Sequence, residues 1–423
     1  MAPPPESTGE PRTLSLGGVT SLRSRLVAWC VLAVVSWINL VSHAPWQRDA
    51  HLSAYGDALE YYRMSEQTFA PVDNPFALRV LTPWLVRKLH QISGISPDSV
   101  WIGFTFVTTL AAVLLFHSML LRHFKVSAYT ALLVAGMLAC TFWYAPYLFG
   151  NPWLVDPLNN LLYVAAIWLA LDRRLLWFTA VVVVGTVNKE TTLLLAPLYP
   201  LLALARTRKL TDRSVLAGAA ATVVAAGLYF AFRLWAQARI GGDYALGAGQ
   251  ANKSLMDNIR FALASAKGRD QLAIWSVFSF AWLIWLYGLY RLRVTSGLRH
   301  PLIVTSAWVF FCCLFGRVLA TDTERVFVML APVLLAVIAV TLDHYAGPAQ
   351  RPWLLAIAAM YVARQLHWVS DPVTFIIDVV ALGVFAAIVT LTHRNTRPAA
   401  TIEPEGAPSA QDVPAGRSAG VDQ

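Results

Sequence analysis

Long apolar stretches follow one another from Leu26 to Leu391, separated by short polar segments. A helix needs about 20 mostly apolar residues to cross the hydrocarbon core of a bilayer. Only 13% of the residues are charged, whereas soluble domains carry about 25%. These features exclude an ordinary soluble protein. They predict an all-α fold, a polytopic transmembrane helical bundle.

Basic residues set the orientation of such helices, because they concentrate in cytoplasmic loops. Here they cluster in every second loop, at Arg23/Arg25, Arg122/Lys125, Arg173/Arg174, Arg206/Arg208/Lys209/Arg213, Arg291/Arg293/Arg299, Arg351 and Arg394/Arg397. Placing these loops inside predicts about twelve helices, within a range of about 10 to 13. The predicted helices are 26–43, 99–121, 127–148, 155–171, 175–188, 191–205, 214–236, 271–290, 301–318, 326–342, 352–369 and 373–391.

The sequence predicts one membrane domain, residues 23–394, between disordered cytoplasmic segments 1–22 and 395–423, whose compositions cannot form a core. We expect the plasma membrane (the inner membrane of a bacterium), with both termini in the cytoplasm. The net charge is +9, but the basic residues lie in short clusters between apolar runs, so no nucleic-acid partner is expected. The four cysteines, all within apolar runs, indicate neither disulfides nor zinc.

The first outer loop, residues 44–98, is long enough to hold two short juxtamembrane helices. Asp57, Glu60 and Tyr61 are spaced i, i+3, i+4, so both carboxylates project from one face of a helix. A solvated surface face is the alternative interpretation of these acids. Asn74 and Pro75 are typical of a helix start, which predicts a helix over 76–90 in which Arg79 and Thr82 share a face and Pro83 makes a kink. Arg79 could equally be a snorkelling surface arginine.

Charged residues also interrupt two apolar regions. Lys189 and Glu190 separate runs too short to cross the whole bilayer, so we expect them at the bottom of a cavity that opens outward. The alternative is a Lys189–Glu190 pair that fixes two helix ends. Glu324 and Arg325, with Asp322, follow another apolar run and form either a phosphate site or a surface turn.

Two further outer segments contain polar residues. Asp156 closes the motif Asn151-Pro-Trp-Leu-Val-Asp156, which is either a site or a turn with a helix cap. The outer loop 237–270 contains Ser254-x-x-Asp257 and apolar residues at helical spacing, which predict an amphipathic helix on the membrane surface. Nucleotide-binding and metallohydrolase motifs are absent from the sequence.

Four short motifs occur in the segments described above: Gly56-Asp-Ala-Leu-Glu-Tyr-Tyr62, Pro75-Phe-Ala-Leu-Arg-Val-Leu-Thr-Pro83, Asn188-Lys-Glu-Thr191 and Glu324-Arg-Val-Phe-Val-Met-Leu-Ala-Pro332. These motifs resemble the GT-C superfamily of integral-membrane glycosyltransferases, which includes bacterial protein O-mannosyltransferases and lipid A aminoarabinose transferases. The resemblance covers roughly residues 25 to 345, and the motifs agree with that superfamily in their order and in their expected side of the membrane. The chain differs from it in two respects: Asp57 and Glu60 lie three residues apart, whereas many members have adjacent acids, and no folded outer C-terminal domain is expected.

The resemblance implies an inverting transfer of a sugar from a polyprenyl-phosphate donor to a hydroxyl of a glycan, lipid or protein acceptor at the outer face. Asp57 is then the general base, Glu60 positions the acceptor, and cationic groups stabilise the leaving lipid phosphate. No cofactor is expected; a divalent metal is compatible with the acids but not indicated. A transporter or lipid flippase is the alternative class. The predicted substrate-binding residues are Tyr61, Arg79, Asp156, Lys189, Glu190, Glu324 and Arg325.

Overall fold

The computed structural model describes residues 22–47, 50–54, 56–69, 72, 76–240, 269–319, 322–366 and 371–396. Every regular element in these ranges is helical. The predicted amphipathic helix at Ser254, the helix start at Asn74 and Pro75, and most of the two terminal segments lie outside the described residues. The all-α fold predicted from the apolar runs is therefore confirmed for the described part of the chain.

The described elements occur in the following order along the chain. In the first half of the chain they are α1 (Leu22–His43), η1 (Ala50–Ser53), α2 (Asp57–Glu66), η2 (Phe76–Leu78), α3 (Leu81–Ser93), α4 (Pro97–Arg122), α5 (Ala128–Cys140), α6 (Pro146–Gly150), α7 (Asp156–Leu171), α8 (Leu175–Asn188), η3 (Glu190–Leu195) and α9 (Leu198–Thr207). In the second half they are α10 (Arg213–Ile240), α12 (Arg269–Phe278), α13 (Ala281–Ser296), α14 (Pro301–Leu319), α15 (Thr323–Phe327), η4 (Val328–Leu330), α16 (Ala331–His344), η5 (Pro348–Gln350), α17 (Arg351–Gln365) and α18 (Asp371–Thr396).

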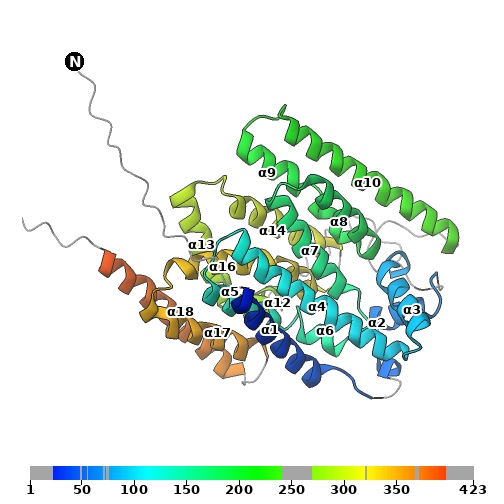
Figure 1. Cartoon of the computed structure of the whole chain (residues 1–423), viewed down its shortest axis with the longest axis horizontal. Coiled ribbons are helices and arrows are strands. Elements are labelled where there is room, and N and C mark those ends of the chain that lie inside the picture. Colours follow the sequence, from blue (N-terminus) through cyan, green and yellow to red (C-terminus); the bar gives the residue numbers. More distant parts are fainter. Residues whose placement is uncertain are drawn as a thin grey trace, which may run out of the picture.

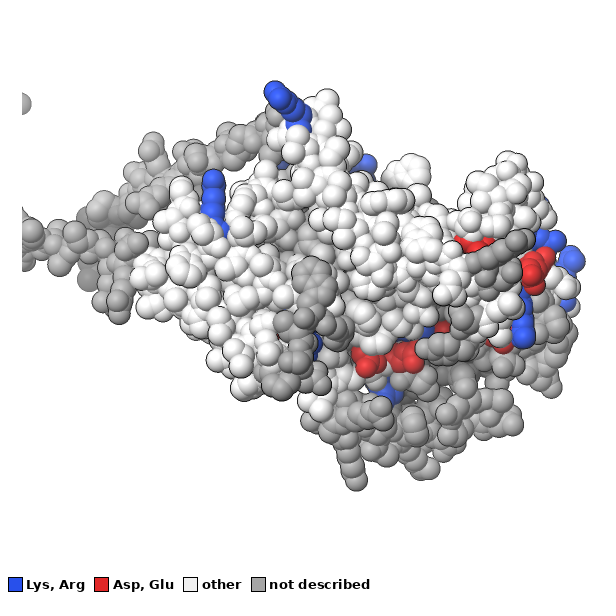
Figure 2. Space-filling model, turned by 90° about the horizontal axis from the view of Figure 1, so that it is seen from below, with Lys and Arg blue, Asp and Glu red and all other residues white. Residues whose placement is uncertain are grey.

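Several of these helices have the length and the apolar composition of membrane-spanning helices. Five are long and apolar enough to span one, or six if the bent pair α12 and α13 forms one span. Three apolar helices, α5, α8 and α14, are shorter. The count of about twelve spanning helices is not confirmed. Figure 2 shows a face on which most described residues carry no charge, and the acidic groups visible there lie in the right half of the view, the end where Figure 1 places α2 and α3.

Some predicted helices differ from those observed because the chain bends where polar groups satisfy the backbone. The predicted helix 127–148 stops at Cys140, where Gln365 accepts a hydrogen bond from the backbone N–H of Phe142 (3.0 Å). The predicted helix 271–290 is broken between α12 and α13, which meet at 76°. The predicted helix 191–205 is instead η3 followed by α9, with Pro197 between them.

The helix predicted over 76–90 with a kink at Pro83 is also different. The chain forms the short η2, passes through Arg79 and Val80, and only then enters α3. Pro83 lies in the first turn of α3, where its missing N–H costs nothing, and a longer helix would force its ring against the carbonyl of Arg79. Helix α3 therefore begins at Leu81, and Arg79 lies before its first residue.

Two apolar cores organise the fold. The larger core surrounds α16, of which nearly every residue is buried, and includes residues of α4, α5, α7 and α13. A helix that is apolar on all sides is expected at the centre of a membrane domain. The smaller core joins residues 50–86 to the starts of α4 and α7, through Tyr61, Trp101, Trp153 and Val155 among others. The smaller core therefore fixes α2 beside the first residue of α7.

Candidate functional site

Helix α2 begins at Asp57, directly after Gly56. Gly56 has φ of 60°, a left-handed conformation that glycine adopts without strain, and this turn sets the direction of α2. Asp57 and Tyr61, one helical turn apart, both point into the site. The side chain of Tyr61 is fully buried, while that of Asp57 is 19% exposed. Asp57 is therefore fixed in position and still accessible.

Arg325 is the centre of the first group of charges. Its Nη1 lies 2.6 Å from Oδ2 of Asp57 and 2.9 Å from Oδ2 of Asp322. Its Nη2 donates to Oδ2 of Asp156 at 2.7 Å. The side chain of Arg325 is only 8% exposed, so one guanidinium joins three carboxylates from three separate parts of the chain.

Asp156 links this group to Lys189. Its second oxygen, Oδ1, accepts a hydrogen bond from Nζ of Lys189 at 2.6 Å, and both side chains are nearly buried. Asp156 is the first residue of α7, where the helix dipole favours a carboxylate, and the N-cap position before it is occupied by Val155. Asp156 is therefore not the N-cap residue of α7, and its carboxylate pairs with Lys189 and Arg325.

A second group of charges is centred on Arg79. Its Nε donates to Oε2 of Glu190 at 2.9 Å, its Nη2 donates to Oε1 of the same carboxylate, and its Nη1 donates to the phenol oxygen of Tyr61 at 2.6 Å. Burial alone would lower the pKa of Arg79, but the carboxylate of Glu190 raises it well above its ordinary value. Burial raises the pKa of Tyr61 above its usual range. Arg79 thus stays charged and Tyr61 stays neutral.

The segment 188–190 joins the two groups, because Lys189 belongs to one and Glu190 to the other. Asn188 ends α8, and Lys189 is extended. The amide of Asn188 donates to the carbonyl of Val155 (3.0 Å) and accepts from the hydroxyl of Thr82 (2.6 Å). These bonds fix the side chain of Asn188 at the end of α8. The backbone at Lys189 is extended, and Lys189 and Glu190 pair with different partners.

A close contact between Gly185 and the side chain of Thr192 lies next to this bend. A Cβ atom at Gly185 would lie 2.4 Å from the Cγ2 atom of Thr192, so only glycine fits there. Thr192 in turn donates to Oδ1 of Asn159 at 2.8 Å. The break between α8 and η3 is therefore packed and hydrogen-bonded on both sides.

Two of the predicted site residues do not join these groups. Glu60 lies 3.5 Å from Arg63 on the same helix, measured between its Oε1 and Nη1 of Arg63, and reaches none of the central cations. Glu324 precedes Arg325 in α15, but it makes no ion pair with another described residue. The other seven predicted residues, Asp57, Tyr61, Arg79, Asp156, Lys189, Glu190 and Arg325, form one connected site that also includes Asp322.

The sequence interpretation missed Arg233 in α10. Its side chain is buried, and its Nη1 donates to the hydroxyl of Tyr229 at 2.5 Å. A charged residue inside a stretch long enough to span the membrane is rare and usually functional, so its position alone could have identified it. Among the described residues, no group of three or more His, Cys, Asp or Glu side chains is placed to hold a metal ion.

Comparisons with known proteins identify no family for this chain. No protein-family model matches it, and no characterised protein is significantly similar in sequence.

Proposed function

We propose that this protein is a membrane glycosyltransferase that moves a sugar from a polyprenyl-phosphate donor to an acceptor hydroxyl, with inversion at the anomeric carbon. One observation supports this best: Asp57 of the outer loop and Arg325 of α15 meet at 2.6 Å, beside Asp156 and Lys189. An accessible carboxylate next to fixed cations is the combination that such a transfer requires.

Asp57 is suited to the role of general base. Its Oδ2 is held by Arg325, and Oδ1 has no hydrogen-bond partner among the described residues. In the proposed step, Oδ1 takes the proton of the acceptor hydroxyl while the hydroxyl oxygen bonds to the anomeric carbon. A well-placed base of this kind contributes about 100-fold to 10,000-fold to the rate.

Lys189 and Arg79 are suited to stabilise the negative charge of the leaving lipid phosphate. As the bond from the anomeric carbon to the phosphate oxygen breaks, the electron pair stays on the lipid phosphate, and fixed cations stabilise this charge. The ammonium of Lys189 has three N–H groups and uses one on Asp156. Arg79 uses one N–H group on Tyr61 and two on Glu190, so two more remain. Both cations can therefore bind an anion without losing their carboxylate partners.

The test is a chemical comparison of the cell envelope. A deletion strain is complemented with the wild-type chain, with Asp57→Asn, or with Glu66→Gln, and its glycolipids and glycans are compared by mass spectrometry. Glu66 is a matched control, because it is an exposed acid on the same helix. We expect one sugar modification to disappear on deletion and to return with the wild type and Glu66→Gln, but not with Asp57→Asn.

Two outcomes would contradict the proposal. If Asp57→Asn restores the modification as well as the wild type, Asp57 is not the base. If a lipid-linked substrate crosses the membrane in vesicles that contain the protein, and no covalent product forms, the same charges belong to a transporter or flippase.

A further inference from the structure

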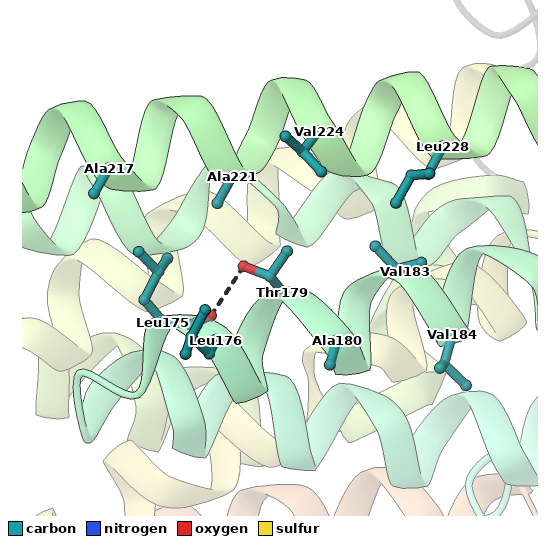
Figure 3. A pocket seen from close by; sticks show the side chains of 10 residues that line it. All are labelled: Leu175, Leu176, Thr179, Ala180, Val183, Val184, Ala217, Ala221, Val224 and Leu228. Atoms are coloured by element: carbon teal, nitrogen blue, oxygen red, sulfur yellow. Dashed lines mark hydrogen bonds between the residues drawn. The ribbon is translucent and has the colours of Figure 1, made fainter.

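An open apolar groove lies between α8 and α10, with a volume of about 620 Å³. Figure 3 shows that the two helices run in the same direction. Leu175 of α8 lies near Ala217 of α10 at one end of the groove, and Val184 lies near Leu228 at the other. Thr179, the one polar residue of the lining, donates its hydroxyl to the carbonyl of Leu175 at 2.9 Å, so the groove offers only apolar contacts.

The length of the groove matches one leaflet of a bilayer. Leu175 and Val184 are nine residues apart on α8. An α-helix rises about 1.5 Å per residue, so these residues are separated by about 14 Å. This is roughly half of the hydrocarbon core, which is about 30 Å thick. Helix α10 is one of the candidate spanning helices, so an acyl chain of one leaflet would cover the groove from end to end.

Three arginines lie at one end of the groove. Arg174 is bonded directly to Leu175, and Arg213 lies one helical turn before Ala217 on the same face of α10. Arg173 precedes Arg174 in the turn between α7 and α8. All three are exposed, and none of them forms an ion pair with another described residue. The cations are therefore placed where the groove begins.

A fourth arginine, Arg206 in the last turn of α9, adds to the positive charge at this end. Burial lowers the pKa of Arg206, the nearby charge of Arg173 lowers it further, and Asp212 offsets only part of this effect. Like charges held this close repel each other, and a phosphate between them relieves the repulsion. The arrangement therefore favours an anion beside Arg173.

The two acids of these turns do not pair with the arginines. Oδ1 of Asp172 lies 2.6 Å from Nδ1 of His123. Oδ1 of Asp212 accepts a hydrogen bond from the backbone N–H of Ser214 at 2.8 Å, and Asp212 forms no ion pair within the described part of the chain. This end of the groove therefore keeps a positive charge that no described carboxylate neutralises.

An exposed tryptophan places the same end at the surface of the bilayer. Trp177, in the first turn of α8, is 66% exposed, and Trp is enriched where the hydrocarbon meets the lipid head groups. The turns 172–174 and 208–212 belong to loops predicted to be cytoplasmic, and the cytoplasmic leaflet is the one that carries anionic lipids. The arginines and the groove are therefore complementary to the head group and the acyl chain of one lipid.

We propose that the groove between α8 and α10 binds an anionic phospholipid of the cytoplasmic leaflet, with its phosphate at Arg173, Arg174 and Arg213 and one acyl chain along the groove. A zwitterionic lipid would fill the groove but gain less from the arginines, because basic residues near the surface attract anionic head groups. This site is separate from the proposed reaction, since the arginines lie at the start of α8 and Lys189 follows its end.

The test measures lipid binding and needs no sugar transfer. The full chain is purified in detergent, and phosphatidylglycerol or phosphatidylcholine with the same acyl chains is titrated against it by native mass spectrometry. We expect the wild type to bind phosphatidylglycerol about tenfold or more tightly than phosphatidylcholine. The double variant Arg173→Gln with Arg213→Gln should lose this preference, whereas its binding of phosphatidylcholine should not change.

Arg293→Gln with Arg299→Gln is the matched control. Both arginines are exposed, at the end of α13 and in the loop after it, and this loop is also predicted to be cytoplasmic. The control therefore removes the same charge from the same predicted side of the membrane. It should bind phosphatidylglycerol like the wild type. An equal loss in both double variants would mean that the lipid is attracted to any basic surface, and the proposed site would be wrong.

A second pair of variants tests the groove and does not alter any charge. Ala180 is an exposed residue of the groove lining, so Ala180→Phe fills the groove and should weaken the binding of phosphatidylglycerol about tenfold. Ala219→Phe makes the same substitution at an exposed position of α10 outside the lining and should have no effect.

Each opposite result would overturn the inference. If Arg173→Gln with Arg213→Gln keeps the preference for phosphatidylglycerol, these arginines only orient the helices in the membrane. If Ala180→Phe binds phosphatidylglycerol like the wild type, no acyl chain lies in the groove. If the wild type binds both lipids equally, the groove takes any lipid of the bilayer. None of these outcomes bears on sugar transfer that depends on Asp57, which the deletion strain tests separately.

Discussion

The carboxylate of Asp57, at the start of α2, lies 2.6 Å from the guanidinium of Arg325 in α15, near the other end of the chain. The same guanidinium also binds Asp156 at the start of α7. The starts of α2 and α7 and the short helix α15 are thereby held together at one buried arginine. A change at any of the three residues therefore affects both the position of the proposed base and the stability of the fold.

The first prediction concerns Asp57 and Glu60. Asp57→Asn keeps the size and hydrogen bonding of the side chain but removes the proton acceptor, so turnover should fall about 100-fold or more with little change in donor binding. Glu60→Gln should have a smaller effect, because Glu60 pairs with Arg63 and not with the central cations. Product formation from a panel of polyprenyl-phosphate sugars measures both variants. Near-normal transfer by Asp57→Asn, with none by Glu60→Gln, would reverse the two roles.

The second prediction concerns Arg325. Arg325→Met leaves Asp57 and Asp156 without their shared partner, and breaking a buried ion pair from one side typically costs about 3 to 5 kcal/mol. We expect poor insertion and a lower thermal midpoint in detergent. Adding Asp156→Asn to the variant removes one unpaired charge and should recover part of the midpoint. A single variant as stable as the wild type would show that the site is open to water.

The local part of the fold could be predicted from sequence, and the contacts between distant segments could not. The ends of α1, α4, α7 and α8 follow from apolar runs, basic residues and caps, and the structure places them close to the predicted positions. The breaks after α5 and between α12 and α13 depend on Gln365, which accepts from the backbone N–H of Phe142 and donates to the carbonyl of Val277. No local pattern reveals such a partner, since it comes from another helix.

The same distinction holds for the candidate site. Unusual charges within apolar surroundings identify Asp57, Arg79, Lys189 and Arg325, because such charges are expensive and need partners. Their pairing was not predictable. Lys189 and Glu190 are neighbours in sequence, yet the extended backbone at Lys189 turns them toward different partners. The interpretation of these two residues as one ion pair is therefore wrong.

The third prediction uses this pairing. Glu190→Gln should leave the protein inserted but lower its activity, because it loosens Arg79 at the bidentate contact. The double variant Arg79→Glu with Glu190→Arg should recover expression relative to either single change. The exchange Lys189→Glu with Glu190→Lys should recover nothing, since it places each charge beside a like charge. The yield in the membrane fraction and the thermal midpoint are compared for Glu190→Gln, for the two double variants and for their single changes. Recovery by the second exchange would contradict the observed contacts.

The fourth prediction concerns Tyr61 and pH. Burial raises the pKa of its phenol above the ordinary value of about 10, so the folded protein keeps this proton at a pH where the unfolded chain loses it. The contribution of Tyr61 to stability is therefore complete below about pH 10 and is lost as the pH rises further toward the folded pKa.

Tyr61→Phe removes both the titrating group and the hydrogen bond from Arg79 (2.6 Å). Its thermal midpoint should be lower than that of the wild type at neutral pH, and the difference should shrink above about pH 10. Tyr290→Phe, at a tyrosine 62% exposed, is the control and should follow the wild type at every pH. A difference that stays constant or grows above pH 10 would show that Tyr61 titrates freely and is not enclosed beside Arg79.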